Sequence, residues 1–175
     1  MRIKRVISLL VMFLLLGAFT PPLVEGTDEY NLKAAFVYRF TNYIEWDTNL
    51  ATDEFVIGVV GNSPITTSLN AIAKSQLAKG KKIVVRQFDS PAEIGRCHIL
   101  FIPQKTPFSL FDIMAKVPAR GMLTISEKPG YASLGTGINF ILVDDKLKFE
   151  INTKELYSSG LTASSQLLKL AVIVN

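Results

Sequence analysis

Short apolar runs rich in β-branched residues alternate along the chain with segments whose apolar positions have helical spacing. Such runs favour strands that are buried on both faces of a parallel sheet. The runs are 55–61, 82–88, 97–103, 122–127, 138–143 and 146–151. Asp144-Asp145 separates the last two, which predicts a tight turn between antiparallel strands. The pattern therefore predicts an α/β fold: a mostly parallel central sheet with flanking helices and an antiparallel hairpin at one edge.

Helical spacing between the runs predicts the flanking helices. They are expected at 29–46, 65–78, 107–117 and 153–159, with a short turn or helix at 91–94. Thr162 is expected to cap a last helix, whose residues 167–174 are apolar except for Lys169. Ser63 is suited to cap the second helix and Pro64 to begin it. In the third helix Leu110, Phe111 and Met114 are expected to point inward.

The first helix, "EYNLKAAFVYRFTNYIEW", is unusually aromatic. At 100° per residue its apolar side chains fall on one arc: Leu32, Phe36, Phe40, Tyr43 and Ile44, with Val37 at the edge. Lys33 lies on the same arc, where its long stem can cover apolar surface. The opposite side carries Tyr38, Arg39, Asn42, Glu45 and Trp46. These charges and amides exclude a helix buried in a bilayer, so we expect this helix to pack on a protein core.

A targeting leader is predicted before this helix. Arg2, Lys4 and Arg5 precede an apolar run, 6–19, whose 14 residues are fewer than the roughly 20 that span a membrane. We expect a signal peptide at 1–26, cleaved near Gly26, with an uncleaved N-terminal anchor as the alternative. Residues 27–175 then form one α/β domain, which the leader would send out of the cytoplasm.

The net charge and the cysteine count restrict the class of partner and the disulfides that this chain can have. The full chain carries a net charge of +4, but residues 27–175 hold 16 Lys and Arg against 14 Asp and Glu, or +2. A strongly positive net charge, which is the main argument for nucleic-acid binding, is therefore absent from residues 27–175, and we expect no nucleic-acid partner. Cys97 is the only cysteine, so no intramolecular disulfide can form, and we expect a buried, unreactive thiol.

Catalytic and metal-binding motifs are not found in the sequence. His98 is the only histidine, which excludes a histidine-based metal cluster. Cys97 and His98 are neighbours on one strand and point to opposite faces, so they cannot act as a thiolate–imidazole pair. We predict no enzymatic activity, no metal site and no cofactor. Asn62 and Ser63 lie between a strand and a helix N-terminus, where backbone amides can bind an anion, although an ordinary capped turn is the simpler explanation.

Four segments spread over the chain resemble the YfiR/HmsC-like family of exported bacterial regulatory proteins. They are "EYNLKAAFVYRFTNYIEW", "CHILFIP", "GINFILVDDKLKFEIN" and "SGLTASSQLLKLA". The resemblance implies a periplasmic, non-enzymatic α/β domain that binds and represses a membrane-bound diguanylate cyclase, which holds down cyclic-di-GMP and biofilm formation. It also implies that homodimers can form. Disulfides found in some members have no counterpart within this chain, because Cys97 is alone.

Two functions follow as hypotheses. The first is a periplasmic regulator that binds an inner-membrane signalling protein, either a diguanylate cyclase or a sensor kinase, through the partner's periplasmic domain. Its contact residues are predicted on the polar side of the first helix: Tyr38, Arg39, Asn42 and Trp46. Trp46 has an alternative role, which is to pack the helix end against the sheet. The second hypothesis is a periplasmic small-ligand-binding domain serving a sensor or transporter, with its site near Asn62 and Ser63.

Overall fold

An eight-stranded sheet organises the part of the chain that the computed structural model describes, residues 25–46 and 52–174. Side by side, its strands are β10 (Val172–Val174), β8 (Lys146–Asn152), β7 (Ile138–Val143), β6 (Leu123–Ser126), β5 (Ile99–Ile102), β2 (Glu54–Val60), β4 (Lys81–Phe88) and β3 (Leu77–Ala78). The five strands from β7 to β4 are parallel, and β8 is antiparallel to β7. The predicted fold class is confirmed. The hairpin lies one strand in from the edge, because β10 pairs with β8.

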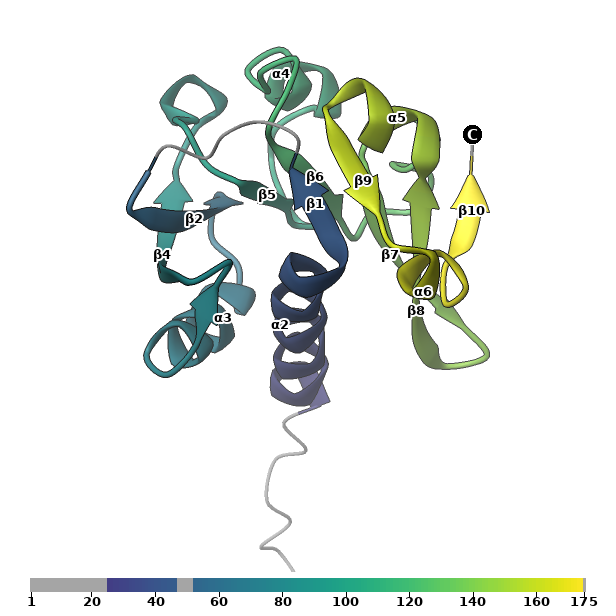
Figure 1. The fold of residues 1–175 in the computed structure, drawn as a ribbon, viewed down its shortest axis with the longest axis horizontal. Coiled ribbons are helices and arrows are strands. Elements are labelled where there is room, and N and C mark those ends of the chain that lie inside the picture. Colours follow the sequence, from purple (N-terminus) through teal and green to yellow (C-terminus); the bar gives the residue numbers. More distant parts are fainter. Residues whose placement is uncertain (1–24, 47–51, 175) are drawn as a thin grey trace, which may run out of the picture.

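The two faces of the sheet bury separate cores. Successive residues of a strand point to opposite faces, so Phe101 enters the larger core and Leu100 the smaller one. The larger core is covered by α2 (Glu25–Tyr43), α3 (Ile65–Ala73) and α6 (Ser165–Leu168), and the smaller by α4 (Leu110–Met114) and the 3₁₀ turn η1 (Pro91–Glu93). In Figure 1, α2 stands in front of the sheet beside a separate antiparallel ladder of β1 (Ile44–Trp46) and β9 (Leu161–Ala163).

The hairpin and the segments around it form as predicted. Asp144 and Asp145 both adopt positive φ, 51° and 57°, which is the two-residue turn that matches the twist of the strands. The short helix after β8 is α5 (Thr153–Ser158), and the Asn152 side chain caps it by accepting a hydrogen bond of 2.9 Å from the Glu155 amide. Gly160, with φ of 69°, follows its end.

The first helix begins and ends earlier than predicted, and it presents a different side to the core. It ends at Tyr43, because Ile44–Trp46 pairs with β9 instead. Its buried residues are Lys33, Ala34, Val37, Phe40 and Thr41, and Ile44 at the start of β1 is also buried. Leu32, predicted to be buried, is 48% exposed, and Phe36 and Tyr43 are only partly buried. The small residues Ala34 and Val37 let the helix approach the sheet closely, and Lys33 and Thr41 have polar partners inside, so the helix is turned by about one residue from the predicted orientation.

Two middle helices were also predicted too long. The helix expected at 65–78 ends at Ala73, because Leu77–Ala78 forms β3, antiparallel to β4. Lys79 and Gly80, with φ of 52° and 75°, make the turn between those strands. The helix expected at 107–117 is only α4, and Phe111 points outward with 83% of its surface exposed.

The prediction of the last helix was wrong. Thr162 lies in β9 opposite Glu45, and the helix that follows, α6, is a single turn capped by Ser164, whose hydroxyl accepts from the Leu167 amide at 3.3 Å. Val172–Val174 is a strand. Its β-branched residues favour extended backbone, and the outer edge of β8 offers unpaired backbone groups to bond.

The N-terminal prediction falls almost wholly outside the described residues. Of the expected signal peptide, 1–26, the structure describes only Glu25 and Gly26, which are the first two residues of α2. In the described part of the chain, no helix is both long and apolar enough to cross a membrane.

Candidate functional site

An open groove of about 320 Å³ lies between α2, β8 and α6. We call it the α2 groove, and its lining residues are Phe36, Arg39, Phe40, Tyr43, Phe149, Gln166, Leu167 and Leu170. The helix supplies one wall because its exposed side carries apolar residues as well as Arg39. The other wall comes from segments more than 100 positions later in the chain, which the fold brings back to the first helix.

Packed aromatic rings form the floor of the α2 groove. The Phe40 and Phe149 ring centroids are 5.1 Å apart in an edge-to-face arrangement, and Phe36 is 5.8 Å from Phe149. Phe40 and Phe149 are almost fully buried, whereas Leu170 on the rim is 72% exposed. The groove therefore combines a fixed apolar floor with an apolar rim that is open to solvent, which is typical of a surface that accepts another chain.

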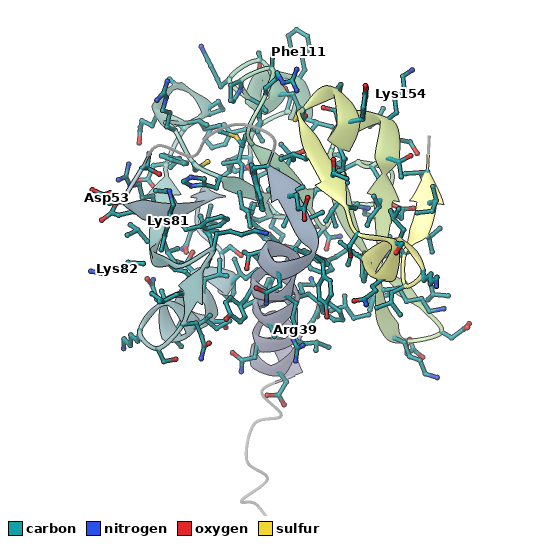
Figure 2. The ribbon with its side chains drawn as sticks, in the orientation of Figure 1. Arg39, Asp53, Lys81, Lys82, Phe111 and Lys154 are labelled. Carbon is teal, nitrogen blue, oxygen red and sulfur yellow. The ribbon has the colours of Figure 1, made fainter. Side chains whose placement is uncertain are left out.

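Arg39 is the only charged side chain among the lining residues of the α2 groove. It is exposed, makes no ion pair with another described residue, and lies on the outward side of α2 in Figure 2. A guanidinium beside aromatic side chains is a frequent anchor in protein interfaces, because it offers several hydrogen-bond donors on a plane that also stacks.

The other three predicted contact residues do not line this groove. Tyr38 is partly buried between helices, and its hydroxyl donates to Gln76 Oε1 at 3.0 Å. Asn42 is exposed on α2. Trp46 lies in β1, with its ring edge-on to Phe55 at 5.5 Å, which is the arrangement of the packing alternative. Within the described residues its buried Nε1 has no hydrogen-bond partner. The structure thus separates Arg39 from Trp46, and the contact role of all four residues stays a prediction.

A second cavity, about 310 Å³, lies at the carboxyl ends of β5, β6 and β7 beside the N-terminal half of α2. We call it the acidic hollow, and it is lined by Glu29, Lys33, Gln104, Glu127, Pro129, Phe140, Ile141, Leu142 and Leu147. The carboxyl edge of an open α/β sheet is the usual place for ligands.

A buried ion cluster forms the polar wall of the acidic hollow. Lys33 Nζ pairs with Glu127 and also with Glu29, at 2.5 Å from its Oε1. The Glu127 carboxylate further accepts from the Gln104 amide at 3.0 Å and the Tyr30 hydroxyl at 3.4 Å. Burial lowers the pKa of Lys33, but its bonds to the two carboxylates outweigh burial and raise that pKa above its ordinary value. Burial, followed by the Glu127 charge, raises the pKa of Tyr30.

Sequence reasoning missed this cluster. Lys33 was expected to cover apolar surface, yet it is 5% exposed and its ammonium group is buried with a partner. The available signal was Glu127, an acid placed directly after the buried run "MLTIS" at the carboxyl end of a parallel strand. Buried lysines need a countercharge, so a lone lysine on an apolar helix face could have been matched with that acid.

The predicted ligand residues Asn62 and Ser63 follow β2 at the same edge of the sheet, but they line neither cavity. Asn62 is exposed, and Ser63 is buried with its hydroxyl 3.4 Å from the Ile65 amide, from which it accepts. The helix begins at Ile65, the first residue of the expected range, but Pro64 rather than Ser63 occupies the cap position. A ligand role for these two residues stays a prediction.

Cys97 and His98 are core residues, as predicted. The Cys97 thiol is buried, and burial raises its pKa to about 12. The His98 ring stacks on Phe55 at 4.6 Å, its Nδ1 accepts from the Val56 amide at 2.9 Å, and its Nε2 lies 3.4 Å from Thr52 Oγ1. Burial, and then the charge of Lys81, lower the pKa of His98. Within residues 25–46 and 52–174, no group of three or more acidic, His or Cys side chains is placed to hold a metal ion.

Comparison with known protein families gives one match over most of the chain. Residues 30–172 match the family described as YfiR/HmsC-like. The matched range includes every residue that lines the α2 groove and all but Glu29 of those that line the acidic hollow.

Proposed function

The chain belongs to the YfiR/HmsC-like family, and from this membership we propose that it is a periplasmic, non-enzymatic regulator. It binds the periplasmic domain of an inner-membrane signalling protein, a diguanylate cyclase, and represses it. Cyclic-di-GMP synthesis is thereby held down while the two proteins are bound.

The observation that carries this proposal is the α2 groove. Phe36 and Tyr43 have the spacing of a core stripe, yet they stay partly exposed along a concave surface. Leu32, one turn before Phe36, is 48% exposed. Leaving apolar side chains in contact with water costs about 25 cal/mol for each Å², so a second chain that covers them gains this free energy. We place the contact surface on the exposed side of α2, with Arg39 as its charged anchor.

The chemistry of the α2 groove supports binding rather than catalysis. The Arg39 guanidinium offers hydrogen-bond donors and no acceptor, so it cannot take a proton as a general base. Gln166 and Tyr43 can donate and accept hydrogen bonds there. Such groups recognise a surface and do not form a nucleophile–base pair.

Capture from membranes tests this function. The full chain, tagged and produced in its own cells, is isolated from solubilised membranes, and cyclic-di-GMP is measured in cells that lack the chain. We expect an inner-membrane diguanylate cyclase to be captured with the chain, and cyclic-di-GMP to rise when the chain is deleted. Failure to capture any inner-membrane signalling protein, together with unchanged cyclic-di-GMP after deletion, would rule the proposed function out.

The acidic hollow favours a second candidate, a small-ligand-binding domain that serves a sensor or transporter. Its volume of about 310 Å³ is at the lower end of small-molecule sites, and it lies at the carboxyl edge of the sheet. A thermal-shift screen of the full chain with amino acids, nucleotides and inorganic anions separates the two functions. A ligand that binds only the folded state raises Tm, whereas the regulator function requires no such shift.

A further inference from the structure

The acidic hollow and the α2 groove adjoin along α2. The ring of Phe36 divides them: it lies 6.1 Å from Phe140, which lines the hollow, and 5.8 Å from Phe149, which lines the groove. Leu32, one turn before Phe36 on the same side of the helix, is 48% exposed. We call the two cavities, together with the side of α2 that lies between them, the α2 furrow.

The two ends of the α2 furrow carry opposite charge. In the hollow two carboxylates, Glu29 and Glu127, face a single ammonium group, Lys33, which leaves one negative charge in excess. At the groove end the only charged lining residue is Arg39, which leaves one positive charge. An occupant that matches this surface needs a basic group at one end, an acidic group at the other, and apolar side chains between them.

Little of the backbone beneath the α2 furrow is open to an added strand. β7 and β8 pair with each other along their whole length, whereas β7 pairs with β6 only at Ile138 and Asn139, and β8 with β10 only at residues 150–152. The open stretches, residues 140–143 and 146–149, are short and lie on opposite edges of the hairpin, so one added strand cannot bond along the whole furrow, which favours a helix held by side chains. From Glu29 to Tyr43 the furrow spans 14 positions of α2, or about 21 Å, which matches a helix of roughly four turns.

A second copy of this chain does not fit the α2 furrow well. The furrow is concave, with Leu142 and Leu170 exposed on its walls at 65% and 72%. Two concave surfaces brought together around a twofold axis leave the furrows of both copies unfilled, whereas a single helix fills one furrow.

We propose that the α2 furrow binds one amphipathic helix from the periplasmic domain of the partner, with a basic side chain over the acidic hollow and an acidic side chain beside Arg39. This inference rests on the proposed function and adds the chemistry and the charge order of the partner's segment. Its apolar residues, at helical spacing, cover Leu32, Phe36 and Leu170.

Photo-crosslinking in living cells tests the inference. A photoreactive phenylalanine analogue replaces Leu142 at the acidic end or Leu170 at the basic end of the full chain, and adducts are mapped by mass spectrometry. The same analogue at Phe111 is the matched control, because that side chain is 83% exposed on α4, away from Arg39 in Figure 2. We expect both furrow positions to label one stretch of about 14 residues in one inner-membrane protein. The stretch has Lys or Arg near the Leu142 adduct and Asp or Glu near the Leu170 adduct, and the control does not label it.

Several results overturn the inference: the reverse charge order, adducts on two separate segments, adducts with a second copy of this chain, or equal labelling from Phe111. If wild-type chain still captures and represses the signalling protein, any of these results removes the furrow inference alone. If no inner-membrane signalling protein is captured at all, the proposed function fails as well.

Discussion

The ring of His98 lies against Phe55 in the core and accepts a hydrogen bond from the Val56 amide through Nδ1. Burial holds its pKa below the ordinary 6.5 in the folded chain. The unfolded chain therefore binds the proton more readily, and the free energy of unfolding falls as pH falls from about 7.5 through 6.5 towards the folded pKa. One proton limits the slope to about 1.4 kcal/mol per pH unit.

Urea unfolding at a series of pH values between about 5.5 and 7.5 measures this slope, because the sequence has no other histidine to titrate in that range. We expect His98→Asn to reduce the slope of the free energy of unfolding against pH. The amide oxygen of the asparagine can still accept from the Val56 amide. A slope that persists in the variant contradicts the assignment to His98.

Single residues also show what the sequence can and cannot predict. Cys97 and His98 could be assigned to the core from their place in an apolar run, because their burial depends only on the strand around them. The pairing of Lys33 with Glu127 could not be assigned in the same way. It joins side chains 94 positions apart, and only the crossing of α2 over the end of β6 brings them together.

At the scale of elements, α2 is attached to the sheet in two ways. Its C-terminal half packs through Val37 and Phe40, and its N-terminal half is held by the Lys33–Glu127 ion pair, whose two side chains are 7% and 1% exposed. Removing one partner of a buried ion pair leaves the other charge uncompensated, which costs about 3–5 kcal/mol, whereas replacing both partners is often close to neutral.

We therefore expect Lys33→Met to lower the free energy of unfolding by about 3–5 kcal/mol, and Lys33→Met with Glu127→Gln to recover most of the loss. The glutamine can still accept from the Gln104 amide. Glu29→Gln is the matched control, because the Glu29 side chain is 44% exposed and its pair with Lys33 contributes less than about 1 kcal/mol. Denaturant unfolding of the four chains measures the effect, and equal stability of the single and double variants would show that the ion pair does not anchor α2.

The boundaries of elements were harder to predict than their presence. The buried strands were predicted because they are continuous apolar runs, and the Asp144-Asp145 hairpin because a short turn separates two of them. Residues 44–46 and 172–174 were assigned to helices, since each continues an apolar helical pattern. Both are strands because an open strand edge lies beside them, at β9 and at β8, and a single sequence does not show which edges stay open.

At the scale of the whole molecule, the fold could be predicted, whereas the shape of the candidate site could not. The fold depends on the alternation of strands and helices, which is local information. The α2 groove depends on how far α2 is turned about its axis and on the return of β8 and α6 to its side. Of the predicted core stripe, Phe40 and Ile44 are buried as expected, whereas Phe36 and Tyr43 form part of one wall of the groove. The buried side of α2 instead holds Lys33 and Thr41 with their own polar partners.

We propose that the chain represses a membrane signalling protein through the exposed side of α2. Arg39→Ala tests it most directly, since Arg39 is exposed and lines the groove, and Lys154→Ala on α5 is the matched control. Cyclic-di-GMP is measured in deletion cells that carry the wild-type chain or either variant, and the free energy of unfolding is measured for each purified chain. We expect Arg39→Ala to raise cyclic-di-GMP towards the level of the deletion while its stability changes by less than about 0.5 kcal/mol, and Lys154→Ala to repress like wild type. Full repression by Arg39→Ala, or an equal loss of repression and stability, would contradict the claim.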